Sequence, residues 1–296
     1  RVQTLGLEHL ASRLDDRLRL LRTGTRTAHF RHMTLRAALD WSYNLLDETH
    51  KHVFERLSVF ASGWELGAAE VVCSDSSGRG DLVDWLGQLV DQSLVQADAQ
   101  PDGTMRYRLL ETVRQYGAEL RMSRGDSATN RRHAIFYLHL AEESDTEARR
   151  DCGEEVWGDQ LHRELDNFRV ALAWCLEESE IEIGLQLANA LSSFWMIGGH
   201  FTEGREWLTR LRQASDGAAP SRIKALCTSG EFAVIQSDLF AAHELFMEAM
   251  TLTQISGDTG GRARALTGLG TLAAHRGNAL SGRALHAEAL RLARVV

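Results

Sequence analysis

The stretch from Ser93 to Leu120 limits the fold of this 296-residue chain more than any other. Residues 93–98 predict a short strand, and Pro101-Asp102-Gly103 predicts a turn, because proline presets φ and glycine accepts positive φ. Residues 105–109 alternate between apolar and basic side chains, as in a half-buried strand. Apolar and small residues then recur at helical spacing, namely Val113, Tyr116, Gly117 and Leu120. The stretch therefore predicts a hairpin followed directly by a helix.

Three helical patterns precede this hairpin, at about residues 48–59, 65–73 and 81–92. Asp47 is expected to cap the first of them. Three helices followed by a two-stranded wing is the order of a winged helix, a variant of the helix-turn-helix architecture. We therefore predict a winged-helix domain over residues 34–124, which begins with a helix over residues 35–46 capped by Thr34. Residues 1–33 precede this domain and are expected to form a helix over 5–22 and a loop over 23–33.

The third of these helices, residues 81–92, would enter DNA in a winged helix that reads DNA. It contains Asp81, Asp84 and Asp91 but no Lys or Arg. DNA binding depends on neutralising phosphates, so an acidic helix would be repelled. The only local basic pair is Arg106 and Arg108 on the wing. The sequence therefore favours a winged helix that packs against protein and disfavours DNA binding through this domain.

The remainder of the chain is expected to be helical. It begins with a connector pair within residues 125–180. Three turn motifs, 38 and 40 residues apart, then separate pairs of helices, namely Gly199-His200-Phe201, Ser237-Asp238-Leu239 and Gly277-Asn278-Ala279. This period resembles tetratricopeptide (TPR) repeats, which stack because one pair cannot bury its own apolar face. We therefore predict a mainly α protein, a winged-helix domain with a two-stranded wing followed by an α-α superhelix of TPR-like repeats over residues 181–296.

Composition excludes several classes of function. A net charge of −8 disfavours nonspecific binding to nucleic acid or acidic membranes. No apolar run approaches the roughly 20 residues that span a bilayer, and the opening residues Arg1-Val2-Gln3 do not resemble a signal peptide. The four cysteines form no CxxC pair, which predicts reduced thiols. A cytoplasmic protein without a membrane partner is expected.

No pattern of catalytic residues was found. The sequence contains no GxSxG, HExxH or Rossmann glycine motif. The only lysines, Lys51 and Lys224, do not fit GxxxxGK[ST], so the chain contains no Walker A motif. His29 and His32 have no third ligand at a suitable spacing, which disfavours a metal site. The chain is therefore expected not to be an enzyme and to hold no cofactor.

Three segments carry a family resemblance. Residues 107–114 (YRLLETVR) resemble the methionine-histidine-aspartate region of signal-transducing STAND ATPases, the group that includes NB-ARC proteins. Residues 57–64 (LSVFASGW) and 31–43 (RHMTLRAALDWSY) resemble AfsR-like and LuxR-family predicted ATPase regulators of actinobacteria. The resemblance is close over residues 9–122 and looser beyond them. It implies that residues 1–33 are the remnant of a helical lid or linker.

The resemblance implies a regulatory and sensor fragment of a STAND ATPase that controls transcription. The winged helix would clamp an upstream nucleotide-binding domain of the same chain, and the TPR array would bind a protein or small-molecule signal. ATP or ADP is then expected for the full-length protein, and the opening on Arg1 is expected to reflect excision from it.

By the same resemblance, the nucleotide-facing positions are Arg31, His32, Leu110 and Glu111. Leu110 stands where the family has its histidine, and leucine offers no donor to a phosphate. Glu111 stands where the family has its aspartate, and suits the N-terminal dipole of the following helix. The simpler interpretations are that Arg31 and His32 join the lid to the winged helix, and that Leu110 is a core residue under the wing.

Two other functions remain open from the sequence. One is a transcription regulator that binds DNA through the winged helix. The other is a TPR protein-interaction adaptor with a vestigial ATPase, which the leucine at position 110 makes more plausible.

Overall fold

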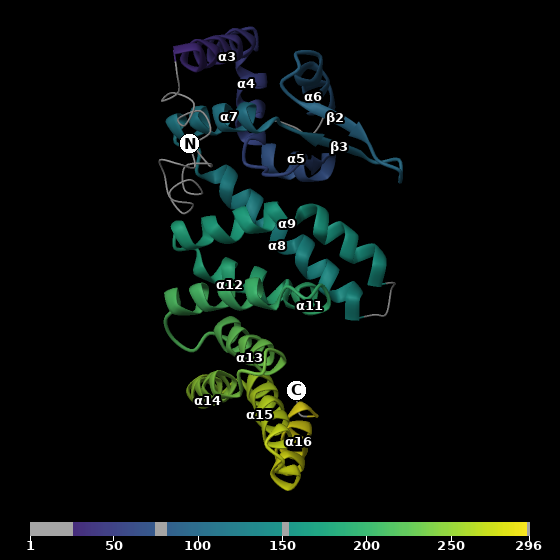
Figure 1. Ribbon diagram of the computed structural model, residues 1–296, viewed down its shortest axis with the longest axis vertical. Coiled ribbons are helices and arrows are strands. Elements are labelled where there is room, and N and C mark those ends of the chain that lie inside the picture. The colour runs from purple at the N-terminus through teal and green to yellow at the C-terminus, as the bar shows by residue number, and fades with distance from the viewer. Residues whose placement is uncertain (1–25, 75–81, 150–153, 295–296) are drawn as a thin grey trace. The chain divides into compact units, whose positions relative to one another are not determined.

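Figure 1 shows the computed structural model, which describes residues 26–74, 82–149 and 154–294. The chain divides into two compact units between Phe136 and Tyr137. The predicted helix over residues 5–22 lies outside the described residues. The domain boundaries predicted after residues 33, 124 and 180 remain predictions.

The first unit contains helices and a small sheet, as predicted for a winged helix. Its elements are α3 (Arg26–Asn44), α4 (Glu48–Leu57), β1 (Trp64–Glu65), α5 (Leu66–Cys73), α6 (Leu82–Asp91), β2 (Gln96–Ala99), β3 (Met105–Arg108), α7 (Glu111–Arg124) and the start of α8 (Ala128–Arg149).

The loop predicted over residues 23–33 is wrong from Arg26 onward. Helix α3 runs without interruption from Arg26 to Asn44, so Thr34 lies inside the helix and does not cap it. No glycine or proline occurs in this segment, and Ala, Leu, Met and Arg favour the helix. Its polar composition was therefore a misleading sign of a loop. The predicted cap at Asp47 is confirmed, because its carboxylate accepts a 2.9 Å hydrogen bond from the amide of His50.

The predicted hairpin is confirmed, with Ala99 of β2 opposite Met105 of β3. Figure 1 shows it projecting from the helices of this unit. The first strand begins at Gln96 rather than at Ser93, because Ser93 has a φ of 59°. The amides of Leu94 and Val95 both donate to the carbonyl of Leu89, so these residues close the end of α6.

Strand β1 adds a third strand that the sequence did not reveal. The sheet order is β1-β3-β2, and Trp64 lies opposite Tyr107. Trp64 is fully buried, with its ring stacked on Phe60 at 5.0 Å between centroids. Two residues are too few to show an alternating pattern, so only the burial of this tryptophan was foreseeable.

A buried polar cluster joins α3, α4 and α7. The Glu55 carboxylate is 2% exposed, accepts a hydrogen bond from the Tyr43 hydroxyl and lies 2.9 Å from Nε of Arg124. Burial and the hydrogen bond to Glu55 raise the pKa of Tyr43. The Tyr116 hydroxyl donates to Asp40 at 2.7 Å. Because a buried carboxylate is costly without partners, these contacts specify how the three helices pack.

The second unit consists of helices throughout its described part. After the end of α8 come α9 (Glu154–Glu177), α10 (Ile181–Ala190), α11 (Ser192–Ile197), α12 (Phe201–Ala214), α13 (Pro220–Ile235), α14 (Leu239–Ser256), α15 (Thr259–His275) and α16 (Ala279–Ala293). The predicted connector pair corresponds to α8 and α9, and the predicted turns separate the later helices.

The three turns share one backbone conformation. Gly199, Ser237 and Gly277 have φ values of 73°, 62° and 78°, which is the left-handed region. Two of the next helices are capped by the residue that follows. Asp238 accepts from the amide of Ala241 at 3.2 Å, and Asn278 accepts from the amide of Ser281 at 3.2 Å. The three turns of the sequence therefore share a left-handed residue, and two of them also share a side chain that caps the next helix.

The repeats pack through close contacts between large side chains and glycines. The Phe246 ring of α14 is fully buried between Gly230 of α13 and Gly268 of α15. A Cβ atom at Gly230 would lie 2.7 Å from the ring, and one at Gly268 would overlap it. Since no larger residue fits at either position, the three helices approach one another closely.

The order of contacts is that of a helical repeat. Each hairpin packs on the next through the pairs α12–α13 and α14–α15. The first helices of successive hairpins also contact one another, in the series α10, α13 and α15. The predicted fold class, a mainly α chain with a winged helix followed by helical repeats, is confirmed.

Arginine–carboxylate pairs connect these helices at their surface. Arg169 of α9 donates two hydrogen bonds to Glu203 of α12, at 2.7 and 2.8 Å. These bonds lower the pKa of Glu203 and raise that of Arg169. Arg205 of α12 makes a 2.6 Å contact with Asp238, and Arg264 of α15 makes 2.8 Å contacts with Glu231 of α13.

The cysteines fit the predicted reduced state. Cys73, Cys175 and Cys227 are free and buried, and Cys152 lies outside the described residues. Burial raises the pKa of the Cys175 and Cys227 thiols to about 12, so both are protonated at neutral pH. Within the described residues, no helix combines the length and the apolar character needed to cross a bilayer.

The packing of Phe246 predicts the effect of a single methyl group. Gly268→Ala should lower the free energy of unfolding by about 1–3 kcal/mol, because the new Cβ overlaps the ring. Urea denaturation followed by circular dichroism measures this change. The matched control is Gly260→Ala in the same helix, where the nearest atom is 3.6 Å away. An equal loss in both variants would contradict this packing.

The pair of Arg169 and Glu203 predicts a pH dependence. The folded pKa of Glu203 lies below its ordinary value of 4.5, so the pair stabilises the fold above that pH and less below it. Glu203→Gln should therefore lower stability by about 1 kcal/mol at pH 7, a modest value because both side chains are partly exposed.

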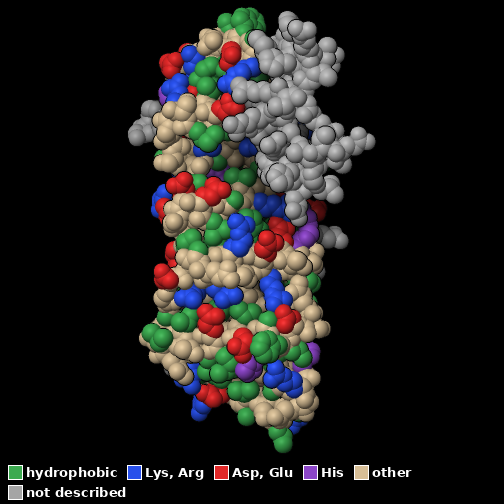
Figure 2. All heavy atoms as spheres, turned by 60° about the vertical axis from the view of Figure 1, so that its left-hand side comes forward, with side chains coloured by type: hydrophobic (Ala, Val, Ile, Leu, Met, Phe, Trp, Pro, Cys, Tyr) green, Lys and Arg blue, Asp and Glu red, His purple; other side chains and the backbone are tan. Residues whose placement is uncertain are grey.

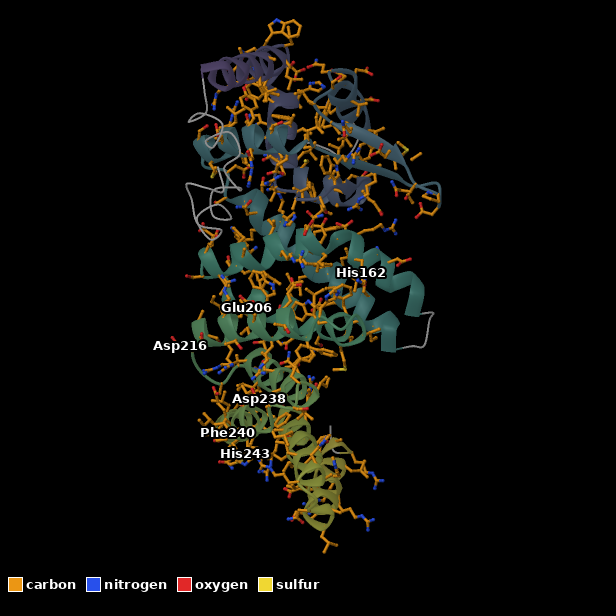
Figure 3. The ribbon with its side chains drawn as sticks, in the orientation of Figure 1. His162, Glu206, Asp216, Asp238, Phe240 and His243 are labelled. Atoms are coloured by element: carbon orange, nitrogen blue, oxygen red, sulfur yellow. The ribbon has the colours of Figure 1, made fainter. Side chains whose placement is uncertain are left out.

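The difference between wild type and Glu203→Gln should narrow as the pH falls below about 4.5. Urea midpoints measured from pH 7 to pH 4 test this. Glu206→Gln on the same helix is the control, and Figure 3 labels this residue. A difference that does not depend on pH would show that the ion pair is not its cause.

Candidate functional site

The exposed side of α6 is the first surface to consider, because a DNA-reading winged helix would use it. Leu82, Leu86 and Leu89 are buried and form the inner face of this helix. The exposed residues are Val83, Asp84, Gly87, Gln88 and Asp91. Within residues 82–91 this surface therefore has acidic groups and no basic group. Asp81 lies outside the described residues.

The two wing arginines are already engaged within the unit. Arg106 donates to the carbonyl of Gly63 at 3.2 Å. Arg108 donates to Gln96 at 2.9 Å and lies 3.3 Å from the Asp98 carboxylate. A phosphate would have to compete with these partners, so the hairpin offers little free positive charge.

The four predicted nucleotide-facing positions lie on two different helices. Arg31 and His32 belong to α3, and their side chains lie outside what the structure describes. Leu110 is the N-cap residue of α7 and Glu111 is its first residue. The structure therefore brings Leu110 and Glu111 together and leaves their relation to Arg31 and His32 undescribed.

The environment of Leu110 corrects one expectation. Leu110 is 51% exposed and not a core residue, because it precedes the helix and lies outside its buried face. The Glu111 carboxylate accepts hydrogen bonds from Arg114 and Gln115, at 2.8–2.9 Å. An apolar side chain and an anionic one do not suit the phosphates of a nucleotide. Neither side chain offers a hydrogen-bond donor to a phosphate, and the nucleotide-facing role of Leu110 and Glu111 stays a prediction.

The second unit contains a polar groove of about 630 Å³. It is open to solvent and lined by three helices that each begin a hairpin, α8, α10 and α13. Its lining residues are Glu142, Asp145, Thr146, Glu182, Gln186, Asn189, Ala190, Pro220, Ser221 and Lys224. The volume is within the usual range for small-molecule sites.

Hydrogen bonds hold two of the three carboxylates of this groove in place. Glu182 accepts from Gln186 at 2.9 Å and from Ser221 at 2.7 Å. Asp145 accepts from the Ser193 hydroxyl at 2.6 Å. These bonds join α10 to α13 and α8 to α11 before any ligand binds.

Asn189 is the most unusual residue of the groove. It is 2% exposed, and its amide nitrogen donates to the carbonyl of Ser221 at 2.8 Å. Its carboxamide oxygen is buried and has no hydrogen-bond partner among the described residues. An unsatisfied buried acceptor costs about 1–3 kcal/mol unless a water or a ligand supplies a donor.

A row of polar residues, in which Thr228 is fully buried, continues from the groove along α13. Ser221, Lys224, Thr228 and Glu231 follow one another at helical spacing. Arg264 of α15 donates to Thr228 at 3.1 Å and to both oxygens of Glu231. Burial disfavours the charge of Arg264, but the Glu231 carboxylate outweighs this effect and raises the pKa of the guanidinium.

The groove was not found from the sequence, although a signal for it exists. Glu182, Gln186 and Asn189 recur at helical spacing in the otherwise apolar α10. A polar stripe on an apolar helix usually indicates a solvated face, and only the packed helices show that three stripes meet. Among the described residues no group of three or more His, Cys, Asp or Glu side chains could hold a metal ion.

Comparisons with known proteins support the winged helix. Residues 46–122 match the family described as winged helix-turn-helix domain. The prediction of this domain is therefore confirmed over these residues.

The chain is also similar to mycobacterial proteins. A protein of Mycobacterium tuberculosis named "Putative HTH-type transcriptional regulator" is 36% identical over 312 residues, covering 100% of this chain and 34% of the relative. An "Uncharacterized protein" of the same species is 33% identical over 129 residues, covering 43% of this chain and 33% of the relative. This chain spans about a third of the length of these curated relatives.

A solved structure also resembles the chain. It is a STAND protein with a tetratricopeptide repeat sensor from Pyrococcus horikoshii, 14% identical, with a TM-score of 0.34. The match covers 86% of this chain and 45% of the other. A TM-score this low supports no argument about function.

The environment of Leu110 and Glu111 predicts that nucleotides do not bind there. Adding 1 mM ADP or ATP with Mg²⁺ should leave the melting temperature of this chain unchanged. A nucleotide that bound with a Kd of about 0.1 mM would be present at about tenfold excess and would raise the melting temperature. Leu110→Ala should give the same result as wild type. A nucleotide-dependent rise in Tm that Leu110→Ala removes would contradict this interpretation.

Proposed function

We propose that this chain is the regulatory part of a STAND-type transcription regulator. In this proposal the winged helix packs against another part of the same protein. The helical repeats are TPR-like and receive a signal in the groove lined by α8, α10 and α13. The chain itself performs no chemical reaction.

The assignment to transcription rests on the relatives and on sequence resemblance. A relative that is 36% identical along this whole chain is named as a helix-turn-helix regulator. The segments at residues 31–43, 57–64 and 107–114 resemble STAND regulators. Since the chain spans about a third of such relatives, their remaining length has room for a nucleotide-binding domain and an output domain.

The acidic surface of α6 is the single observation that carries the role of the winged helix. Asp84 and Asp91 are exposed on it, and residues 82–91 contain no Lys or Arg. Arg106 and Arg108 on the hairpin have partners within the unit. Repulsion of DNA phosphates by this surface favours packing against protein.

The groove supports the sensory role of the repeats. It has the size of a small-molecule site, the Glu182 and Asp145 carboxylates are held by hydrogen bonds, and it contains a buried acceptor without a partner. In the proposal ATP or ADP binds elsewhere in the longer protein and not through Leu110 or Glu111. A cytoplasmic location belongs to the same proposal.

A DNA-binding assay tests the role of the winged helix. This chain should bind a 24-base-pair duplex with a Kd weaker than about 10⁻⁴ M, because its α6 surface repels phosphates. Fluorescence anisotropy at 50 mM and 200 mM salt measures the affinity.

The control for this assay is the double variant Asp84→Arg and Asp91→Arg, with both changes on the exposed face of α6. It should bind the duplex more tightly at 50 mM than at 200 mM salt, which shows that the surface is accessible. Tight, salt-dependent binding by wild type would overturn the proposal and favour a DNA-binding regulator.

A further inference from the structure

We infer that the groove of the repeat unit binds a small organic cation that carries ammonium or guanidinium N–H donors. This inference rests on the proposed sensory function and specifies its ligand. It is based on the charge of the groove, on the fixed position of Glu182 and on the free oxygen of Asn189.

The charge of the groove is the first argument. Its lining contains the three carboxylates of Glu142, Asp145 and Glu182 and the single ammonium of Lys224. Three negative charges against one positive charge give a formal charge of −2. Lys224 already has a partner within the protein, so it does not offer a free cation to an anionic ligand. The groove therefore favours a cation.

The position of Glu182 is the second argument. Hydrogen bonds from Gln186 and Ser221 use one site on each of its two oxygens. An ionised carboxylate has about four acceptor sites, so about two remain for a ligand. Because the carboxylate is already oriented, a ligand donor gains a charge-assisted hydrogen bond without first ordering that side chain.

The carboxamide of Asn189 is the third argument. The carbonyl of Ser221 can only accept, so the NH₂ group of Asn189 must face it. The amide oxygen is therefore the end without a partner, and it can only accept. It requires an N–H or O–H donor, which an ammonium or guanidinium group supplies and a carboxylate or phosphate at neutral pH supplies poorly.

The size and the lining of the groove favour an organic cation over a metal ion. A groove of about 630 Å³ has room for a molecule larger than a metal ion. Its carboxylates come from two helices, with Glu142 and Asp145 on α8 and Glu182 on α10. A chain with two or more amino groups can contact both helices, and an amino group that reaches the buried Asn189 oxygen would supply its missing donor. Spermidine is a suitable probe of this chemistry.

Isothermal titration calorimetry of the whole chain with spermidine tests the inference. Spermidine should bind saturably at 100 mM salt with a Kd of about 1 mM or tighter. Glu182→Gln and Asn189→Leu should each weaken binding about tenfold, because each removes one acceptor for the cation. Glu182 is exposed, so its variant folds even if the buried Asn189→Leu does not.

The control variant is Glu206→Gln on α12, which removes the same charge at an exposed residue outside the groove. It should bind spermidine as wild type does. Absence of saturable binding would overturn the inference. Equal weakening by Glu206→Gln and Glu182→Gln would also overturn it, because spermidine binding would then depend only on the net charge of the chain.

Citrate, glucose and an arginine-rich peptide of nine residues separate the other possibilities. Citrate and glucose should show no binding that depends on Glu182. Binding of either that Asn189→Leu abolishes would overturn the cation inference and leave the sensory function intact. A peptide that binds at least tenfold more tightly than spermidine would show that the groove takes a protein segment and would overturn the assignment to a small molecule.

Discussion

The contact of Phe246 with two glycines determines how the helical repeats pack. The ring occupies space that a Cβ at Gly230 or Gly268 would fill, so α13, α14 and α15 can approach only because both residues lack one. The same relation recurs one hairpin earlier, where Gly204 lies against Trp195 and Phe232. This close packing brings the first helices of successive hairpins together. The groove lies elsewhere in the same unit, where polar residues of α8, α10 and α13 line one opening.

The winged-helix unit depends on a different kind of contact. Its interior contains the carboxylate of Glu55, which is stabilised by Tyr43 and Arg124. Trp64 is fully buried beside the sheet. The exposed face of α6 is acidic, and the arginines of the β2–β3 hairpin already have partners within the unit. Figure 2 shows Lys and Arg side chains interspersed with Asp and Glu over the face that it presents, without a large patch of one charge.

Local patterns predicted the elements of the fold well. The hairpin followed by a helix, the cap at Asp47 and the three turns of the repeats were all foreseeable, because each depends on a few neighbouring residues. Strand β1 was missed because two residues cannot show a period. The start of α3 was missed because the Thr, Gly, Arg and His residues of 23–33 were taken as evidence of a loop, although no helix breaker follows Gly24 before the end of α3.

The candidate site was much less predictable than the fold. The groove combines residues from α8, α10 and α13, which are up to 82 positions apart from Glu142 to Lys224. No local pattern indicates that these helices meet. The missing partner of the Asn189 oxygen is likewise visible only when all of its neighbours are known. The expectation that Leu110 is a core residue failed for a similar reason, since its exposure depends on where α7 begins.

Hydrogen–deuterium exchange of the whole chain, with and without spermidine, tests the central claim most directly. The account predicts slower exchange of the amides of α10 and α13 when the cation is bound, because it would join these helices through Glu182 and Asn189. Exchange in α6 and in the β2–β3 hairpin should not change. Protection confined to the winged-helix unit, or no protection in α10 and α13, would contradict the account.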